Sequence, residues 1–549
     1  MMDASASASA SGAWPAQAPA GAPNCEAEQQ GQRDLLRRLR AGWEGRGCRV
    51  QVFETHISWI YVVDQLAYKF KKAMRFDVLD YSTLAARRHC CLEELRLNRR
   101  LAPTLYLGLS AVTGSVARPE LDGRGALLEP AVRMRAFPQE TLWSARLSAG
   151  LLGGAEVDAL ALRLARFHAD AELAAPDTPW GGAATLDRLG RADLAALAGL
   201  PGGRAVRAQL ARVARWHDAQ MAAPARFALR RAQGRVRACH GDLHSGNILT
   251  LEGRVEIFDG IEFNDALRWI DVISDLAFII MDLRFHGRGD LAARLLRGYL
   301  GASDDYQGLA VLRYYLVMRA LVRCKVCLLG ARAPAPARPS QQLAQARRYL
   351  ALAVRGLARR GALVLMHGLS GCGKSYCAGR LADPLEALWI RSDVERKHLH
   401  GVAATTSMAA PARQGIYDAA SDAATYARLL QLARAGLGAG VSVIVDAACL
   451  RRGQRRPFQT LARELGAPYF IVDLRADEAV LRERLERRAS GAPDASDAQV
   501  SLLAYQRAAL EPLTPAERRH ALALDGGASA LDRRLAALAG TIRAAAPPS

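Results

Sequence analysis

The chain has 549 residues and a formal net charge of +20, from 74 basic and 54 acidic residues. This length favours more than one domain, each with enough chain to bury a core. The 10 cysteines are scattered, and no apolar run reaches about 18 residues, so we expect a cytoplasmic protein without a disulfide scaffold or a membrane span.

The positive charge is carried almost entirely by arginines along Ala- and Leu-rich segments, which is typical of a solvated surface and does not favour nucleic-acid binding. Only six lysines occur: Lys69, Lys71, Lys72, Lys325, Lys374 and Lys397. Where arginine is the default cation, a retained lysine indicates a position that needs a compact ammonium, such as a phosphate site.

The first 30 residues are rich in Ala, Ser, Pro and Gly and predict a disordered tail, residues 1–30. A first domain then extends over residues 31–330. It begins with β-type runs at Val50–Phe53, Ile57–Val63 and Leu66–Phe70, which predict a strand hairpin that ends in basic residues.

Lys69 and Lys71 alternate with apolar residues in the last of these runs, so we expect them on one face of the strand. A helix is predicted over Tyr81–Leu101, and it carries Glu93 and Glu94. Residues 126–138 follow as a strand that leads into a connector between lobes, and residues 140–221 have helical periodicity.

The stretch Cys239–Phe263 places three polar side chains at the spacing that phosphoryl transfer requires: Asp242, Asn247 and Asp259. A carboxylate can orient a substrate hydroxyl and accept its proton, while an amide oxygen and a second carboxylate hold Mg²⁺ against a triphosphate. The alternative is a polar surface turn whose side chains bond only to the local backbone.

His240-Gly241-Asp242, with Asn247 and Asp259, resembles the aminoglycoside phosphotransferase branch of the protein-kinase-like fold. The resemblance implies that Asp242 is the catalytic base and that Asn247 and Asp259 hold the metal. It also implies a lysine for the α- and β-phosphates that pairs with a helical glutamate. We assign these roles to Lys69 and Glu94, and Lys71 and Glu93 remain alternatives.

The chain departs from protein kinases in two segments. The loop that would cover the nucleotide, Glu54–Ser58, contains no glycine, and Asp259 is followed by Gly-Ile in place of Phe-Gly. Control of activity through a mobile phenylalanine is therefore not expected.

A proline-rich break and a connecting helix form a predicted linker, residues 331–360, before a second domain over residues 361–549. This domain opens with an apolar strand, Ala362–Met366, and the sequence G-x-x-x-x-G-K-S at Gly368–Ser375. Its expected phosphate-binding residues are Gly368, Ser370, Gly371, Cys372, Gly373 and Lys374, and Ser375 is also expected to ligate Mg²⁺.

Asp393 and Arg396 follow the next strand at a spacing that looks like the acceptor site of small P-loop kinases, and the likeness implies a base and its partner. A helix N-cap is the alternative for Asp393. Asp446 ends another apolar strand and is expected near the metal, as in a Walker-B position. Arg487 lies in an arginine-rich helix that resembles a lid over the phosphates; a solvated surface is the alternative.

The chain as a whole resembles bacterial fusions of an aminoglycoside-phosphotransferase-like domain with a P-loop kinase-like domain. The fold class is therefore α/β and α+β multidomain, with a bilobal kinase-like domain followed by a doubly wound parallel sheet. We expect a bifunctional phosphotransferase with two sites for ATP and Mg²⁺ that acts on alcohol groups of small molecules. The alternatives are a first half that is only a nucleotide-binding regulatory module, or a second half that is a polynucleotide-kinase-like enzyme.

Overall fold

The computed structural model describes residues 25–76, 79–332, 338–358, 360–402, 418–489, 502–525 and 531–546, and the single residues 406, 416 and 500. The chain forms two compact units, Met1–Gly287 with Tyr314–Leu357, and Arg288–Arg313 with Ala358–Ser549. Residues 1–24 of the predicted tail lie outside the described residues. The last part of that prediction is wrong, because helix α1 already begins at Cys25.

The first unit contains an antiparallel sheet with the strand order β1-β2-β3-β8-β6-β7. Its strands are β1 (Val50–Glu54), β2 (Ser58–Val63), β3 (Leu66–Lys71), β6 (Tyr106–Gly114), β7 (Pro119–Leu121) and β8 (Glu129–Arg135). The predicted hairpin is confirmed. Tyr68 and Phe70 of β3 pack with α1 (Cys25–Gly45), while Ala67 packs on the other face with α2 (Leu84–Asn98). Side chains alternate along a strand, so Lys69 and Lys71 face α2.

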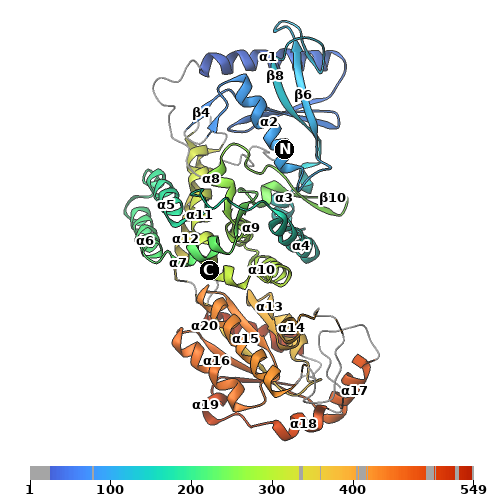
Figure 1. Ribbon diagram of the computed structural model, residues 1–549, viewed down its shortest axis with the longest axis vertical. Helices are drawn as coiled ribbons and strands as arrows, with labels where there is room; N and C mark the ends of the chain where they lie inside the picture. The colour runs from blue at the N-terminus through green and yellow to red at the C-terminus, as the bar shows by residue number, and fades with distance from the viewer. Residues whose placement is uncertain are drawn as a thin grey trace. The chain divides into compact units, whose positions relative to one another are not determined.

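The rest of the first unit is mainly helical and forms a separate lobe from the sheet (Figure 1). Its helices are α3 (Trp143–Ser148), α4 (Gly154–Asp170), α5 (Ala183–Leu197), α6 (Gly203–Met221), α7 (Ala225–Ala232), α8 (Asp265–Arg268), α9 (Val272–Phe285), α12 (Pro339–Gly356) and, from Tyr314 onward, α11 (Leu309–Ala331). Two small antiparallel pairs, β9 (Val236–Ala238) with β12 (Trp269–Asp271) and β10 (Ile248–Leu251) with β11 (Arg254–Ile257), flank the Asp242 loop. This two-lobed architecture confirms the predicted fold class of the first half.

The second unit is built on a parallel sheet in the order β14-β15-β13-β16-β17. The strands are β13 (Leu363–His367), β14 (Ala387–Arg391), β15 (Ser442–Asp446), β16 (Tyr469–Arg475) and β17 (Ala521–Asp525). Helices α13 (Lys374–Ala382) and α20 (Leu531–Ala545) pack on the face that carries Ile444. On the opposite face, Val443 contacts α15 (Ala419–Gly438), so the sheet is doubly wound, as predicted.

One helix of the second unit comes from earlier in the chain than expected. Helix α10 (Gly289–Ser303) belongs to this unit, because Arg297 donates a hydrogen bond to the Ala387 carbonyl at 2.9 Å and pairs with Asp383. The compact units therefore do not divide at residue 330. In the described ranges, no helix is long and apolar enough to cross a lipid bilayer.

Candidate active sites

The Asp242 loop connects β9 to β10 and is held by its own side chains. Asn247 Nδ2 donates to the Asp242 carbonyl at 3.0 Å and to Asp242 Oδ2 at 3.1 Å, and both residues are buried. Burial by itself would raise the pKa of Asp242, but the neighbouring His244 and the charge of Arg323 bring the pKa below its usual range. Asp242 is therefore an ionised carboxylate at neutral pH.

A second carboxylate fixes the backbone of the same loop. Asp275, in the buried helix α9, accepts hydrogen bonds from the amides of His240 and Gly241, each at 3.0 Å. His168 Nε2 lies 3.3 Å from Asp275 Oδ2. Gly241 has φ +88°, and a Cβ there would lie 2.7 Å from the Leu267 carbonyl oxygen, so glycine is required. These contacts position Asp242 from behind the site.

This anchor predicts a defined sensitivity to acid. Burial favours the protonated form of Asp275, but His168 and His240 lower the pKa to about 2. A carboxyl group whose pKa is lower in the folded than in the unfolded chain stabilises the fold at pH values above its unfolded-state pKa, which is about 4. About 2 kcal/mol of this stabilisation is lost as the pH falls from about 4 to 2. Hydrogen–deuterium exchange should show the amides of His240 and Gly241 losing protection in this range, after correction for the intrinsic rate.

The control for this measurement is Asp275→Asn, whose amide protection at His240 and Gly241 should be lower from the start and should fall less between about pH 4 and 2. Protection that falls equally in both proteins would contradict the assignment.

Asp259 is the second residue after β11, and its backbone has φ +62°, in the left-handed region. Its amide donates to the Tyr106 hydroxyl at 3.1 Å, and the amide of Gly260 donates to Asn98 Oδ1 at 2.7 Å. Asn247 Oδ1 is buried and has no hydrogen-bond partner among the described residues. An orphaned amide oxygen together with a carboxylate is a hard-oxygen donor set that fits Mg²⁺.

The two lysines of β3 share one glutamate of α2. Lys69 Nζ lies 2.9 Å from Glu94 Oε1 and also pairs with Asp259. Lys71 Nζ lies 2.7 Å from Glu94 Oε2 and pairs with Glu262. Burial opposes ionisation of Glu94, but the two ammonium groups bring its pKa below its usual range. Because Lys69 pairs with Asp259, this lysine faces the segment that the sequence predicts to bind metal.

The alternative glutamate is placed elsewhere. Glu93 pairs with Arg96 at 2.8 Å on the exposed side of α2, so Glu94 is the residue that meets both lysines.

Lys71 is completely buried between two carboxylates, and we expect it to be essential for the stability of the sheet lobe. Lys71→Met would leave the buried Glu262 without its ammonium partner, and breaking such a pair costs about 3–5 kcal/mol. Chemical denaturation monitored by tryptophan fluorescence measures the loss. Lys72→Met is the control with a smaller expected effect, because its partner Glu54 is 54% exposed.

The turn at Glu54–Ser58, which the sequence predicts to cover the nucleotide, has no glycine but is closed by its own hydrogen bonds. Thr55 Oγ1 accepts from the Ser58 amide at 2.9 Å, and the Thr55 amide donates to the Ser58 carbonyl at 2.9 Å. The turn is thus ordered by a threonine side chain.

In the second unit, the glycine-rich loop lies between β13 and α13. Gly368 has φ +139°, and a Cβ there would lie 2.5 Å from the Leu474 carbonyl oxygen, so the loop packs closely on β16. Lys374 Nζ donates to the Leu369 carbonyl at 2.7 Å.

Asp446, at the end of β15, lies beside this loop. It accepts a hydrogen bond from Ser375 and one from Trp389 Nε1 at 3.1 Å. Burial raises the pKa of Asp446, although Ser375 and Lys374 oppose the shift. The Ser375 hydroxyl and the Asp446 carboxylate are hard-oxygen donors that fit Mg²⁺.

Asp393 and Arg396, the predicted acceptor-site residues, both lie on one short helix. Asp393 lies in the first turn of α14 (Ser392–Leu399), whose N-cap is Arg391, so the N-cap alternative for Asp393 is not adopted. Arg396 is buried and donates to Asp422 Oδ1 at 2.9 Å. Its fixed partner is therefore on α15.

The arginine-rich helix is α17 (Glu478–Ala489). Arg487 is 72% exposed and pairs with Glu483 on the same helix. Arg484 instead donates to the Gly371 carbonyl in the phosphate loop at 3.3 Å. Gln506, in α18 (Leu502–Ala509), also reaches this loop and accepts from the Ser370 amide at 2.8 Å. The sequence did not single out Gln506, since a lone glutamine carries no motif.

Comparisons with known proteins identify two domain families in the chain. A sequence model of the Phosphotransferase enzyme family matches residues 85–313, and one of an AAA domain matches residues 363–513. The uncharacterized protein Rv2004c of Mycobacterium tuberculosis is 30% identical over 465 residues, which cover 84% of this chain and 90% of that protein.

Two solved structures each align with part of the chain. A sugar kinase from Janibacter sp. HTCC2649 is 23% identical and covers 34% of this chain and 96% of its own, with a TM-score of 0.27. The Plasmodium vivax ethanolamine kinase is 10% identical and covers 57% of this chain and 84% of its own, with a TM-score of 0.36.

Proposed function

Because this chain belongs to the family of Rv2004c and joins a phosphotransferase domain to a P-loop kinase-like domain, we propose that it is a bifunctional ATP-dependent phosphotransferase. Each unit transfers the γ-phosphate of its own ATP to an alcohol group of a small molecule. The observation that carries this proposal is the buried pair of Asp242 and Asn247, followed along the chain by the half-buried Asp259. Asn247 Oδ1 has no hydrogen-bond partner among the described residues.

In the first unit, Asp242 is the base. It orients the acceptor hydroxyl and takes its proton as the oxygen bonds to the γ-phosphorus and the bond to the ADP oxygen breaks. Asn247 Oδ1 and Asp259 would hold Mg²⁺, which supplies positive charge for the phosphate oxygens. Lys69, oriented by Glu94, adds a further positive charge at the phosphates.

In the second unit, the amides of the glycine-rich loop and Lys374 bind the phosphates, and Ser375 and Asp446 would hold Mg²⁺. Asp393 is the proposed base for the second acceptor. The pairing of Arg396 with Asp422 supports a role for Arg396 in positioning α14. Arg484 is a better candidate than Arg487 for binding the phosphates, because it already contacts the glycine-rich loop.

The test is a screen of hydroxyl-bearing metabolites with radiolabelled ATP and two full-length variants, each with one site disabled by Asp242→Asn or Lys374→Ala. Full-length chains are needed because the family match to residue 313 includes Arg288–Arg313, which folds with the second unit. Labelled product from each variant, with different acceptors, is expected. If the Lys374→Ala chain labels no acceptor, the first unit is a regulatory nucleotide-binding module instead.

A further inference from the structure

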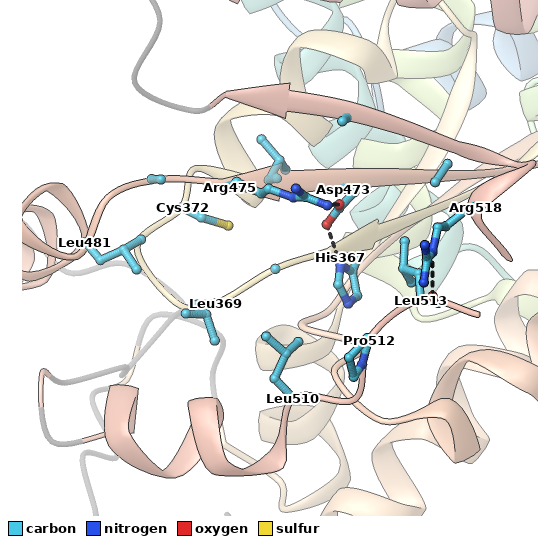
Figure 2. A pocket seen from close by; sticks show the side chains of 15 residues that line it. His367, Leu369, Cys372, Asp473, Arg475, Leu481, Leu510, Pro512, Leu513 and Arg518 are labelled. Atoms are coloured by element: carbon cyan, nitrogen blue, oxygen red, sulfur yellow. Dashed lines mark hydrogen bonds and ion pairs between the residues drawn. The ribbon is translucent and has the colours of Figure 1, made fainter. Parts of the chain in front are cut away.

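The second unit contains a cavity of about 590 Å³ beside the glycine-rich loop (Figure 2). Gly368, Leu369 and Cys372 of the loop line it, together with residues of β16, β17 and the segment before β17. Lys374, Ser375 and Asp446 are not among its lining residues. The cavity therefore touches the phosphate loop without including the groups proposed to bind phosphate and metal. Its volume suits a small organic molecule.

A histidine at the end of β13 offers one nitrogen to this space. His367 Nδ1 lies 2.8 Å from Asp473 Oδ1, and Arg475 donates to Asp473 Oδ2 at 3.1 and 2.8 Å. Although burial acts in the opposite direction, His367 and Arg475 hold the pKa of Asp473 below its usual range, so the carboxylate is the acceptor. Nδ1 is therefore the nitrogen that donates to Asp473. In the tautomer with a single proton on Nδ1, Nε2 is a hydrogen-bond acceptor.

His367 Nε2 has no hydrogen-bond partner in the described part of the chain, although the residue is only 5% exposed. In Figure 2 the ring extends from Asp473 toward Pro512 and Leu513. A buried polar atom left without a partner destabilises the protein, because it has lost its hydrogen bonds to water. A ligand that donates a hydrogen bond to Nε2 would recover part of this cost.

The other walls are mainly apolar and are held in place from outside the cavity. Leu369, Leu510, Leu513 and Ala523 are among the lining residues. The wall segment before β17 is fixed by the buried Arg455, which donates to the carbonyls of Glu511 and Pro512 at 3.2 and 3.4 Å and to Glu517 at 2.7 Å. The walls are thus built by structural contacts that need no ligand.

We propose that this cavity binds a second small molecule in addition to the nucleotide: a ring-sized, mainly apolar compound with one O–H or N–H group, which donates to His367 Nε2. Binding in the cavity is coupled to nucleotide binding through Leu369. This residue lines the cavity, and its carbonyl oxygen accepts a hydrogen bond from Lys374. The coupling rests on the proposed phosphate role of Lys374; binding in the cavity does not. The factor by which the cavity ligand changes the affinity for nucleotide must equal the factor by which the nucleotide changes the affinity for the cavity ligand.

Indole and 1-methylindole form a matched pair of probes, since only indole has an N–H donor. With the full-length protein in calorimetry, indole is expected to bind about tenfold more tightly, which is the value of one hydrogen bond. His367→Phe should remove this preference. Leu513→Trp should weaken both probes by filling the cavity, while Leu465→Trp, on the surface of the same unit, should change neither.

The titrations are repeated with saturating ADP and Mg²⁺. Indole should still bind, with an affinity changed by the same factor as the affinity of ADP in the presence of indole. Complete competition between ADP and indole would overturn the proposal, because the cavity would then belong to the nucleotide. Failure of indole to bind, or equal binding of both probes, would also overturn it. Lys374→Ala should abolish the coupling and leave indole binding intact, which separates this proposal from the proposed nucleotide role of the loop.

Discussion

Asp242→Asn is expected to lower kcat for phosphate transfer by the first unit about 10²–10⁴-fold, the usual contribution of a general base. The substitution keeps the shape of the side chain, and its amide oxygen can still accept the hydrogen bond that Asn247 now donates to Oδ2. The loop backbone also stays anchored on Asp275. Nucleotide affinity should therefore change little, because the proposed role of Asp242 is on the acceptor hydroxyl and not on the nucleotide.

The measurement is transfer of labelled phosphate in a Lys374→Ala background, which silences the second site, with nucleotide affinity determined by calorimetry. Asp218→Asn is the control, since that carboxylate is 54% exposed and belongs to the same unit. Unchanged kcat in Asp242→Asn would refute the base assignment. A large loss of nucleotide affinity with unchanged kcat would instead move Asp242 into the metal-binding group.

Lys374→Ala is expected to reduce turnover by the second unit at least about 10²–10³-fold, because one preorganised charge at the transferred phosphate is removed. Nucleotide affinity in this unit should fall as well, since the proposed role of the lysine includes binding the phosphates before transfer. Loss of the hydrogen bond to the Leu369 carbonyl should cost little stability, because the residue lies at the loop surface and is only part-buried.

This experiment uses Asp242→Asn as the background, so that only the second unit transfers phosphate. Arg380→Ala on the same helix is the matched control, because its side chain is 56% exposed and pairs with Asp532 at the surface. Turnover that survives Lys374→Ala at the full rate would exclude the glycine-rich loop as the phosphate site.

Local patterns in the sequence were sufficient for several elements and for the motifs, although not for the start of α1. Alternating apolar residues predicted β2 and β3 to within a residue or two, and the apolar run before the G-x-x-x-x-G-K-S motif predicted β13. The contiguous motifs around Asp242 and Lys374 were readable for the same reason, since their chemistry depends on residues within one loop.

The partners of these residues were decided by the tertiary structure. Asp275 contacts His168, which lies 107 residues earlier in the chain. No local sequence pattern around either residue indicates this contact. The choice between Glu93 and Glu94 depended on which face of α2 meets β3, a rotation of about 100° that a one-residue shift produces.

The second unit shows the same division. Sequence alone determined the glycine-rich loop, but the pairing of Arg396 with Asp422, the contact of Arg484 with Gly371, and the unpartnered nitrogen of His367 arise only when distant segments pack together. Sequence spacing fixes which groups can act along one strand, turn or helix. Burial and contact between elements decide which of those groups meet, because side chains separated by many residues approach only through the packing of the sheet and its helices.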